Sequence, residues 1–293
     1  MTKIMHRVYV STMMMVGLLT VMLIGVYGYP YYSTPLIERP EAPLDRALSP
    51  VGFWGHGMGF IGSFMMTFGV LMYSIRKRWT RLANVGLIKH FLEFHIFLCL
   101  LGPALIVYHT AFKFGGIISV SFWSMVVVVS SGVIGRYLYL QIPKTIGGKE
   151  ISVIELKKQV AINRLELAET YRIDPELLTT IDQLASGFSE RARTSLLTTF
   201  PRLVVYNWRY NHRIRKILHA IQTTIDHDRY IPVHYIIHEN SKIQRQLASL
   251  AVTQKLFRHW HLFHLPFAMV MFIIMVIHIV VAFLFGYGWI FTS

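Results

Sequence analysis

EFHIFLCLLGPALIVYHTAF (93–112) and LFHLPFAMVMFIIMVIHIVV (262–281) are the two stretches that decide the fold. Each is an apolar run long enough to cross a bilayer as a helix. Each also carries two histidines fourteen positions apart: His95 and His109 in the first, His264 and His278 in the second. At 3.6 residues per turn, fourteen residues stop about 40° short of four full turns and rise about 21 Å. We therefore expect each helix to present two imidazoles along one face, near opposite sides of the hydrocarbon core.

The composition also predicts a membrane protein. Of the 293 residues, 54% are hydrophobic and only 15% are charged, and the mean hydropathy is +0.46. Five segments are long and apolar enough to span a bilayer: 8–27, 51–74, 91–112, 116–140 and 264–285. The first lacks a small-residue cleavage site, which favours a retained anchor over a signal peptide. We expect an all-α integral membrane protein with five transmembrane helices and a helical cytoplasmic insert between the fourth and the fifth.

Charge density divides the chain into three parts. Residues 1–140 are expected to form a four-helix transmembrane block, and residues 259–293 the final transmembrane helix that completes the core. The more polar residues 141–258 between them form the insert. Within it, Asp174 followed by Pro175 predicts the start of one helix, and Pro201 predicts the start of another. The insert carries no cofactor motif, so we expect it to dock partner proteins.

Basic residues indicate the orientation of the helices. Lys3 and Arg7 precede the first segment, and five basic residues follow the second: Arg76, Lys77, Arg78, Arg81 and Lys89. The positive-inside rule then places the N-terminus in the cytoplasm. On this topology the first histidine of each pair lies toward the cytoplasm and the second toward the outside, so the two pairs match in depth. The net charge of +14 is explained by this asymmetry and by anionic membrane lipids, and it does not require nucleic acid.

Histidines at matched depths predict two bis-histidine sites stacked across the membrane. His95 would share one site with His264, and His109 would share the other with His278. An ionisable group inside a membrane is costly and is a functional candidate by default. We expect each site to hold a haem b, so that the two form a path for electrons. Hydrogen-bonded core histidines remain the alternative, whereas zinc is disfavoured because no cysteine or carboxylate accompanies these histidines at zinc-site spacing.

Cys99 is the only cysteine of the chain, and this excludes several redox cofactors. Covalent c-type haem, iron–sulfur clusters and disulfides all need more cysteines. The sequence also has no glycine fingerprint for a dinucleotide or a nucleotide. Electrons must therefore enter and leave through quinol or through partner proteins.

The second segment begins FWGHGMGFIGSF (53–64), which places His56 among closely spaced glycines. Such glycines, Gly59 among them, let another helix or a flat macrocycle approach the backbone closely. Gly102, between the two histidines of the first pair, fits the same interpretation. His56 is the candidate catalytic residue, because it lies at the depth of the outer site and would accept a proton from quinol. Hydrogen bonding to a haem propionate and ligation of a further haem remain open alternatives.

Three sequence patterns resemble a known family. They are HIFLCLLGPALIVYHTAF (95–112), GRYLY followed by IPK (135–144), and W-x3-HLPF-x10-HI (260–279). These patterns resemble the ferric-reductase-like transmembrane group of bacterial b-type cytochromes. The histidine spacing is also similar to that of cytochrome b in the quinol:cytochrome c oxidoreductases. The resemblance covers residues 51–143 and 258–285.

The resemblance implies that His95, His109, His264 and His278 are the ligands of two haem b groups. The chain departs from the true ferric reductases because it lacks a flavin- or NADPH-binding extension, and the insert has no counterpart that we can place. Metal-ion reduction is therefore not expected.

Together these features predict a diheme cytochrome b in the bacterial cytoplasmic (inner) membrane. It would be the multi-pass electron-transfer subunit of a redox complex, with two bis-histidine haems b and quinone as a further candidate cofactor. The expected partners are other redox subunits, either iron–sulfur or multihaem c-type proteins. Two alternatives stay open: a stand-alone transmembrane reductase of an external acceptor, and a haem-free helical scaffold or transporter subunit.

Overall fold

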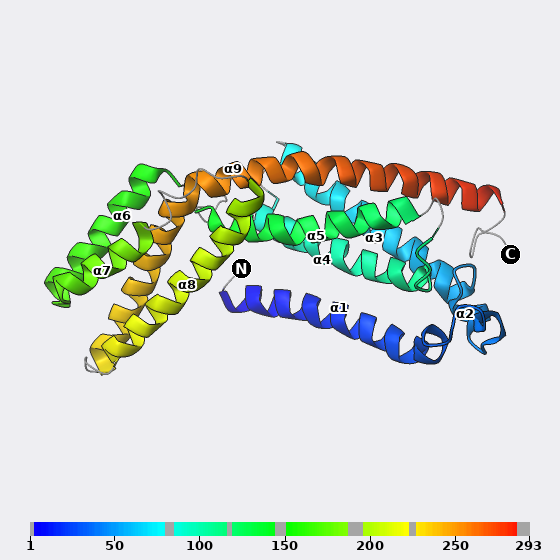
Figure 1. Ribbon diagram of the computed structural model, residues 1–293, viewed down its shortest axis with the longest axis horizontal. Helices are drawn as coiled ribbons and strands as arrows, with labels where there is room; N and C mark the ends of the chain where they lie inside the picture. Colours follow the sequence, from blue (N-terminus) through cyan, green and yellow to red (C-terminus); the bar gives the residue numbers. More distant parts are fainter. Residues whose placement is uncertain are drawn as a thin grey trace. The chain divides into compact units, whose positions relative to one another are not determined.

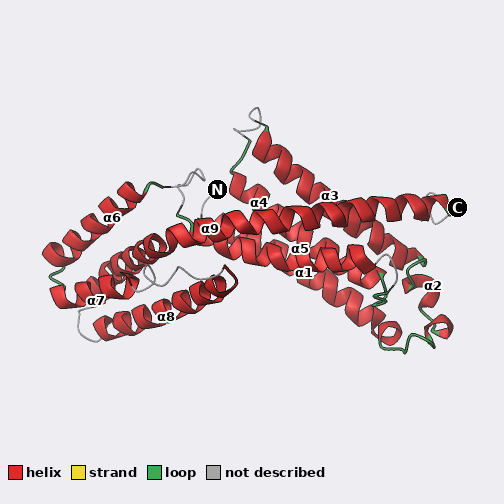
Figure 2. Ribbon diagram, turned by 45° about the horizontal axis from the view of Figure 1, so that its top comes forward, coloured by secondary structure: helices red, strands yellow, loops and turns green. Residues whose placement is uncertain are grey.

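The computed structural model is helical in the part of the chain that it describes. That part comprises residues 3–79, 85–115, 119–143, 151–186, 196–222 and 227–285, and it contains no strand (Figure 2). Five helices are long and apolar enough to span a membrane: α1 (Lys3–Tyr32), α3 (Phe53–Arg78), α4 (Ile88–His109), α5 (Ser119–Gln141) and α9 (His227–Leu284). The predicted all-α membrane protein with five spanning helices is confirmed.

Shorter elements connect these helices. A 3₁₀ turn, η1 (Arg39–Glu41), and α2 (Asp45–Leu48) lie between α1 and α3. Between α5 and α9 lie α6 (Val153–Leu165), the π-helical turn η3 (Glu166–Thr170), α7 (Pro175–Ser186) and α8 (Leu196–Gln222). The predicted helical insert between the fourth and fifth spanning helices is therefore present.

The chain forms two compact units. The first comprises residues 1–133 with 263–293, and the second comprises residues 134–262. The division falls inside α5 and α9, a few residues from the boundaries at 140 and 258 that the charge pattern predicts. The N-terminal block and the final helix thus belong to one unit.

Helices of the first unit run alongside one another (Figure 1). Many of their large apolar side chains are exposed, as expected for helices whose outer faces meet lipid. The closest approach joins α3 to α4. A Cβ added to Gly62 would lie 2.6 Å from the carbonyl oxygen of Gly102, and one added to Gly102 would lie 2.7 Å from that of Gly62. The two backbones therefore touch where neither residue has a side chain.

Arg39 fastens the chain between α1 and α3 to the end of α4. Its side chain is buried, and its guanidinium donates hydrogen bonds to the carbonyl oxygens of Tyr32 (2.8 Å), Thr34 (2.9 Å) and Ala111. A buried charge is costly unless its hydrogen-bonding groups are satisfied. Three carbonyl acceptors satisfy this guanidinium, so Arg39 closes this end of the first unit.

The second unit has its own apolar core. Side chains from η3, α7, α8 and the N-terminal part of α9 form it, including Leu167, Ile181, Ile214 and Val233. Tyr210 is buried beside this core and donates a hydrogen bond to the carbonyl oxygen of Ser241, 3.0 Å away. Burial raises the pKa of the Tyr210 hydroxyl, so the hydroxyl stays protonated and keeps donating at neutral pH.

The predicted start of α7 is confirmed, whereas that of α8 is wrong. Pro175 is the first residue of α7, and the carboxylate of Asp174 accepts a hydrogen bond from the backbone N–H of Glu176 at 2.9 Å. Helix α8 begins at Leu196, so Pro201 lies inside it. Phe200 packs into a cluster with buried Leu138, Leu203 and Leu256, and this packing extends the helix upstream of the proline.

Helix α9 also starts earlier than the apolar run predicts. It begins at His227 and is 58 residues long, although the membrane segment was expected to start at 264. Residues 233–265 contain no glycine or proline to interrupt the helix. Hydropathy marks where a helix can meet lipid, but it does not mark where the helix begins.

Gly62→Ala should destabilise the first unit, because the new methyl group would collide with the backbone of α4. Overpacking of this kind costs about 1–3 kcal/mol. Thermal unfolding of the detergent-solubilised protein, followed by circular dichroism, measures the effect. Gly115→Ala is the control, since no atom lies within 4 Å of a Cβ at Gly115. Equal unfolding temperatures in the two variants would contradict the close approach of α3 and α4.

Candidate cofactor site

A cavity of about 420 Å³ lies within the first unit, bounded by α3, α4, α5 and α9. Three histidines line it: His56 from α3, His109 from α4 and His278 from α9. The rest of its wall is mainly apolar and includes four buried methionines, Met66, Met125, Met271 and Met275. Its volume lies within the range of about 300–1,000 Å³ found for small-molecule and cofactor sites.

His109 lies directly on the backbone of α3. A Cβ added to Gly59 would be 2.9 Å from Cγ and Nδ1 of the His109 ring. Nδ1 of His109 is 2.9 Å from the carbonyl oxygen of Gly55, so the N–H at this position donates to the carbonyl. This contact selects the tautomer that leaves the lone pair on Nε2. Histidine ligands of metals are usually held by such a second hydrogen bond.

His95 lies in the same interface between α3 and α4, fourteen residues before His109. Its ring stacks on that of Tyr73 of α3 with centroids 5.4 Å apart, and its Nδ1 is 3.6 Å from Sγ of Cys99 in its own helix. A backbone carbonyl therefore orients His109, whereas an aromatic ring and a thiol contact His95.

His264 is held by a side chain rather than by the backbone. Its Nδ1 lies 2.6 Å from the hydroxyl oxygen of Ser131 on α5. The Ser131 hydroxyl donates to the carbonyl oxygen of Val128 at 2.8 Å, so its oxygen accepts the Nδ1 proton of His264. His261, three residues before His264, is exposed, and its Nδ1 contacts the carbonyl oxygen of Phe257 in its own helix at 3.2 Å. These contacts favour His264 as the ligand.

His109 and His278, the second histidines of the two pairs, lie at the same end of the first unit, and the cavity is at that end. Helices α5 and α9 are antiparallel, because Ser121 contacts Met271 whereas Ser131 contacts His264. Both His109 and His278 line the cavity. The side chains that contact His95 come from α3 and α4, and Ser131 of α5 contacts His264. Among the described residues, one cavity thus brings together His109 and His278, whereas His95 and His264 contact different helices.

His56 shares the cavity with His109. It is buried in the first turn of α3, and its ring stacks on Phe60 with centroids 5.0 Å apart. The centroids of the His56 and His109 rings are 6.1 Å apart. Gly59 lines the cavity, whereas Gly102 packs against Gly62 and Met66 in the contact between α3 and α4. Of the two candidate glycines, only Gly59 lines the cavity, and its missing side chain makes room for the His109 ring.

Two parts of the site could not be predicted from the sequence. Ser131 has no signal beyond the small residues of SSG (130–132), which occur in a span of valines. The methionine cluster joins three helices that are far apart in the sequence. Methionine is flexible and polarizable, so such a wall adapts its shape to a ligand.

The chain matches no protein family, no curated protein and no solved structure with which it was compared. The chemistry of the site is therefore judged from its side chains. They suit a planar iron porphyrin: imidazoles face an apolar cavity, and Gly59 lets the His109 ring lie against the backbone of α3. Among the described residues that line the cavity, none is a carboxylate.

Ser131→Ala should loosen the orientation of His264, because it removes the acceptor of the Nδ1 proton. Such partners typically contribute 10–100-fold to metal affinity. If the site holds a haem, that haem should show lower occupancy or a shifted midpoint potential in a redox titration followed by absorbance. Ser130→Ala, at an exposed neighbouring position, is the control. If both variants titrate like the parent protein, Ser131 does not position a ligand.

Proposed function

We propose that this protein is a diheme cytochrome b, the electron-transfer subunit of a redox complex in a bacterial cytoplasmic membrane. One observation carries the proposal. His109 and His278, each the second member of a His-x13-His pair, line one apolar cavity, and a backbone carbonyl holds His109 in the tautomer that ligates through Nε2. A helical rise of about 21 Å separates the two members of each pair.

Each histidine then has a definite role. His109 and His278 would be the axial ligands at the cavity, and His95 and His264 those of the second site. A bound haem supplies a one-electron carrier. The Gly55 carbonyl and the Ser131 hydroxyl orient their imidazoles and raise their basicity by accepting the Nδ1 protons. The apolar wall excludes water, and that exclusion tunes the redox potential.

The basic residues at one end of the helices give the proposed orientation. With the N-terminus in the cytoplasm, the cavity lies toward the outside and the site of His95 and His264 toward the cytoplasm. The second unit is then cytoplasmic. Its separate core makes it suited to dock another redox subunit, such as an iron–sulfur or multihaem c-type protein, without disturbing the membrane helices.

His56 has a further role in this proposal. A quinol that gives up an electron beside the cavity must also release a proton from its hydroxyl group. The His56 imidazole lines the same cavity and would accept that proton. A contact with a haem propionate and ligation of a third haem are the competing roles, and they make different experimental predictions.

Changing His109 or His278 to Ala should remove about half of the reduced haem b absorbance, because each variant loses one ligand of the same haem. The double variant should lose no more than either single variant. Difference spectra of the purified protein measure this loss. His259→Ala is the control, since His259 is outside the cavity lining and contacts the carbonyl oxygen of Lys255 in its own helix. Two full haems in both single variants would overturn the proposed ligation.

His56→Gln should keep both haems but slow their reduction by quinol, because glutamine cannot accept the proton. Reduction by dithionite should be unchanged, since it needs no proton acceptor at this position. Stopped-flow absorbance compares the two rates. Unchanged quinol kinetics would exclude the proton-acceptor role, and loss of one haem spectrum would make His56 a ligand.

A further inference from the structure

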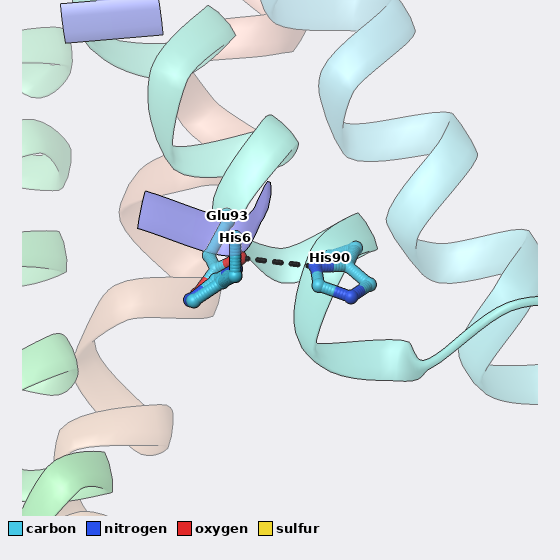
Figure 3. Close-up of side chains that lie close together, drawn as sticks. All are labelled: His6, His90 and Glu93. Atoms are coloured by element: carbon cyan, nitrogen blue, oxygen red, sulfur yellow. Dashed lines mark hydrogen bonds and ion pairs between the residues drawn. The ribbon is translucent and has the colours of Figure 1, made fainter. Parts of the chain in front are cut away.

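A second cluster of ligating side chains lies outside the cavity, where α1 meets the beginning of α4. Figure 3 shows His6 from α1 and His90 and Glu93 from α4 turned toward one another. Nε2 of His6 is 3.5 Å from Oε1 of Glu93, and Nδ1 of His90 is 3.3 Å from Oε2 of the same carboxylate. The three ligand atoms all lie within 4.8 Å of one another.

These separations are close to those of a tetrahedral metal site. Zinc binds histidine nitrogen at about 2.0–2.1 Å and carboxylate oxygen at about 2.0–2.2 Å, which places neighbouring ligand atoms about 3.3 Å apart. Each imidazole is at about this distance from one oxygen of Glu93, His6 from Oε1 and His90 from Oε2. With a single carboxylate oxygen as the ligand, the three ligand atoms lie within 4.8 Å of one another, so no pair has to approach by more than about 1.5 Å.

The local structure explains how these residues come together. His90 and Glu93 are three positions apart on a helix, so they share one face. The Glu93 side chain is only 8% exposed, and burial of an ionised carboxylate is costly without positive charge beside it. His6 reaches the carboxylate from a helix that is more than eighty residues away in the sequence.

Lys89 marks the position of a cation within this cluster. Its ammonium is 2.8 Å from Nε2 of His6 and 3.7 Å from Oε1 of Glu93. The ammonium is a donor, so Nε2 of His6 presents its lone pair toward this point. Nδ1 of His6 is buried without a hydrogen-bond partner. The Lys89 side chain is 49% exposed, so it can move its charge into water and leave the position to a metal.

We propose that His6, His90 and Glu93 form a binding site for a divalent transition metal, with Zn²⁺ as the best match. Two imidazoles and one carboxylate suit zinc, whereas magnesium and calcium prefer oxygen ligands. Three protein ligands leave the fourth position to water. The bound ion links the N-terminal part of α1 to α4 and replaces Lys89 as the charge that neutralises Glu93. The proposal is independent of haem binding.

The test uses the purified full-length chain in detergent, stripped by a chelator and then equilibrated with Zn²⁺ alone. Elemental analysis after gel filtration gives the stoichiometry, and calorimetry gives the affinity. His6→Gln, His90→Gln and Glu93→Gln should each weaken binding at this site at least tenfold. His259→Gln is the matched control and should bind like the parent chain. Haem absorbance is recorded for every variant, so loss of haem is not mistaken for loss of zinc.

Lys89→Leu tests the same site by a gain of affinity. Removal of the competing ammonium should strengthen zinc binding several-fold, a result that misfolding would not produce. X-ray absorption at the zinc edge should show two imidazole nitrogens and a carboxylate oxygen. Zinc binding that is unchanged by the His6, His90 and Glu93 substitutions, or weaker binding in Lys89→Leu, would overturn the proposal.

Discussion

The contact between the backbones of α3 and α4 is the constraint on which the candidate site depends. Gly62 and Gly102 let the two helices touch, and this brings the carbonyl of Gly55 within reach of the His109 imidazole of α4. This carbonyl belongs to a helix, but a carbonyl oxygen has a second lone pair that can accept another hydrogen bond. In a bilayer a polar N–H must find its partner within the protein. Close packing therefore both satisfies the N–H of His109 and sets the orientation of its ring.

In the pair formed by α5 and α9, a side chain rather than a backbone carbonyl orients the histidine. On α5, the hydroxyl of Ser131 takes the place that a glycine carbonyl takes on α3. A side-chain acceptor does not need the two backbones to touch, so α5 and α9 can remain farther apart. Four methionines from α3, α5 and α9 fill part of the intervening space and form the wall of the cavity. A close contact on one side and an adaptable wall on the other are what a flat cofactor needs.

Helix α9 serves two different environments. Its N-terminal part buries polar side chains in the second unit, among them Asn240, Ser249 and Thr253. Its C-terminal part exposes large apolar side chains, as a lipid-facing helix does. Residues 233–265 join the two parts without a glycine or proline, so nothing interrupts the helix between them. The apolar pattern therefore located the lipid-facing part correctly but not the start of the helix, and packing around Phe200 likewise moved the start of α8 ahead of Pro201.

The sequence by itself determined the five spanning helices, the start of α7 at Pro175, and the spacing that puts His95 with His109 and His264 with His278 on one helix face each. These are properties of a single segment, set by its hydropathy and by the 3.6-residue period. Only the tertiary structure decided that His56 joins His109 at one cavity, that Gly102 serves helix packing, that Ser131 holds His264, and that His6 meets Glu93. Those outcomes depend on how far each helix is rotated about its axis and how closely it approaches its neighbour. Both are set by side-chain volumes on two segments at once, so the pattern of either segment does not contain them.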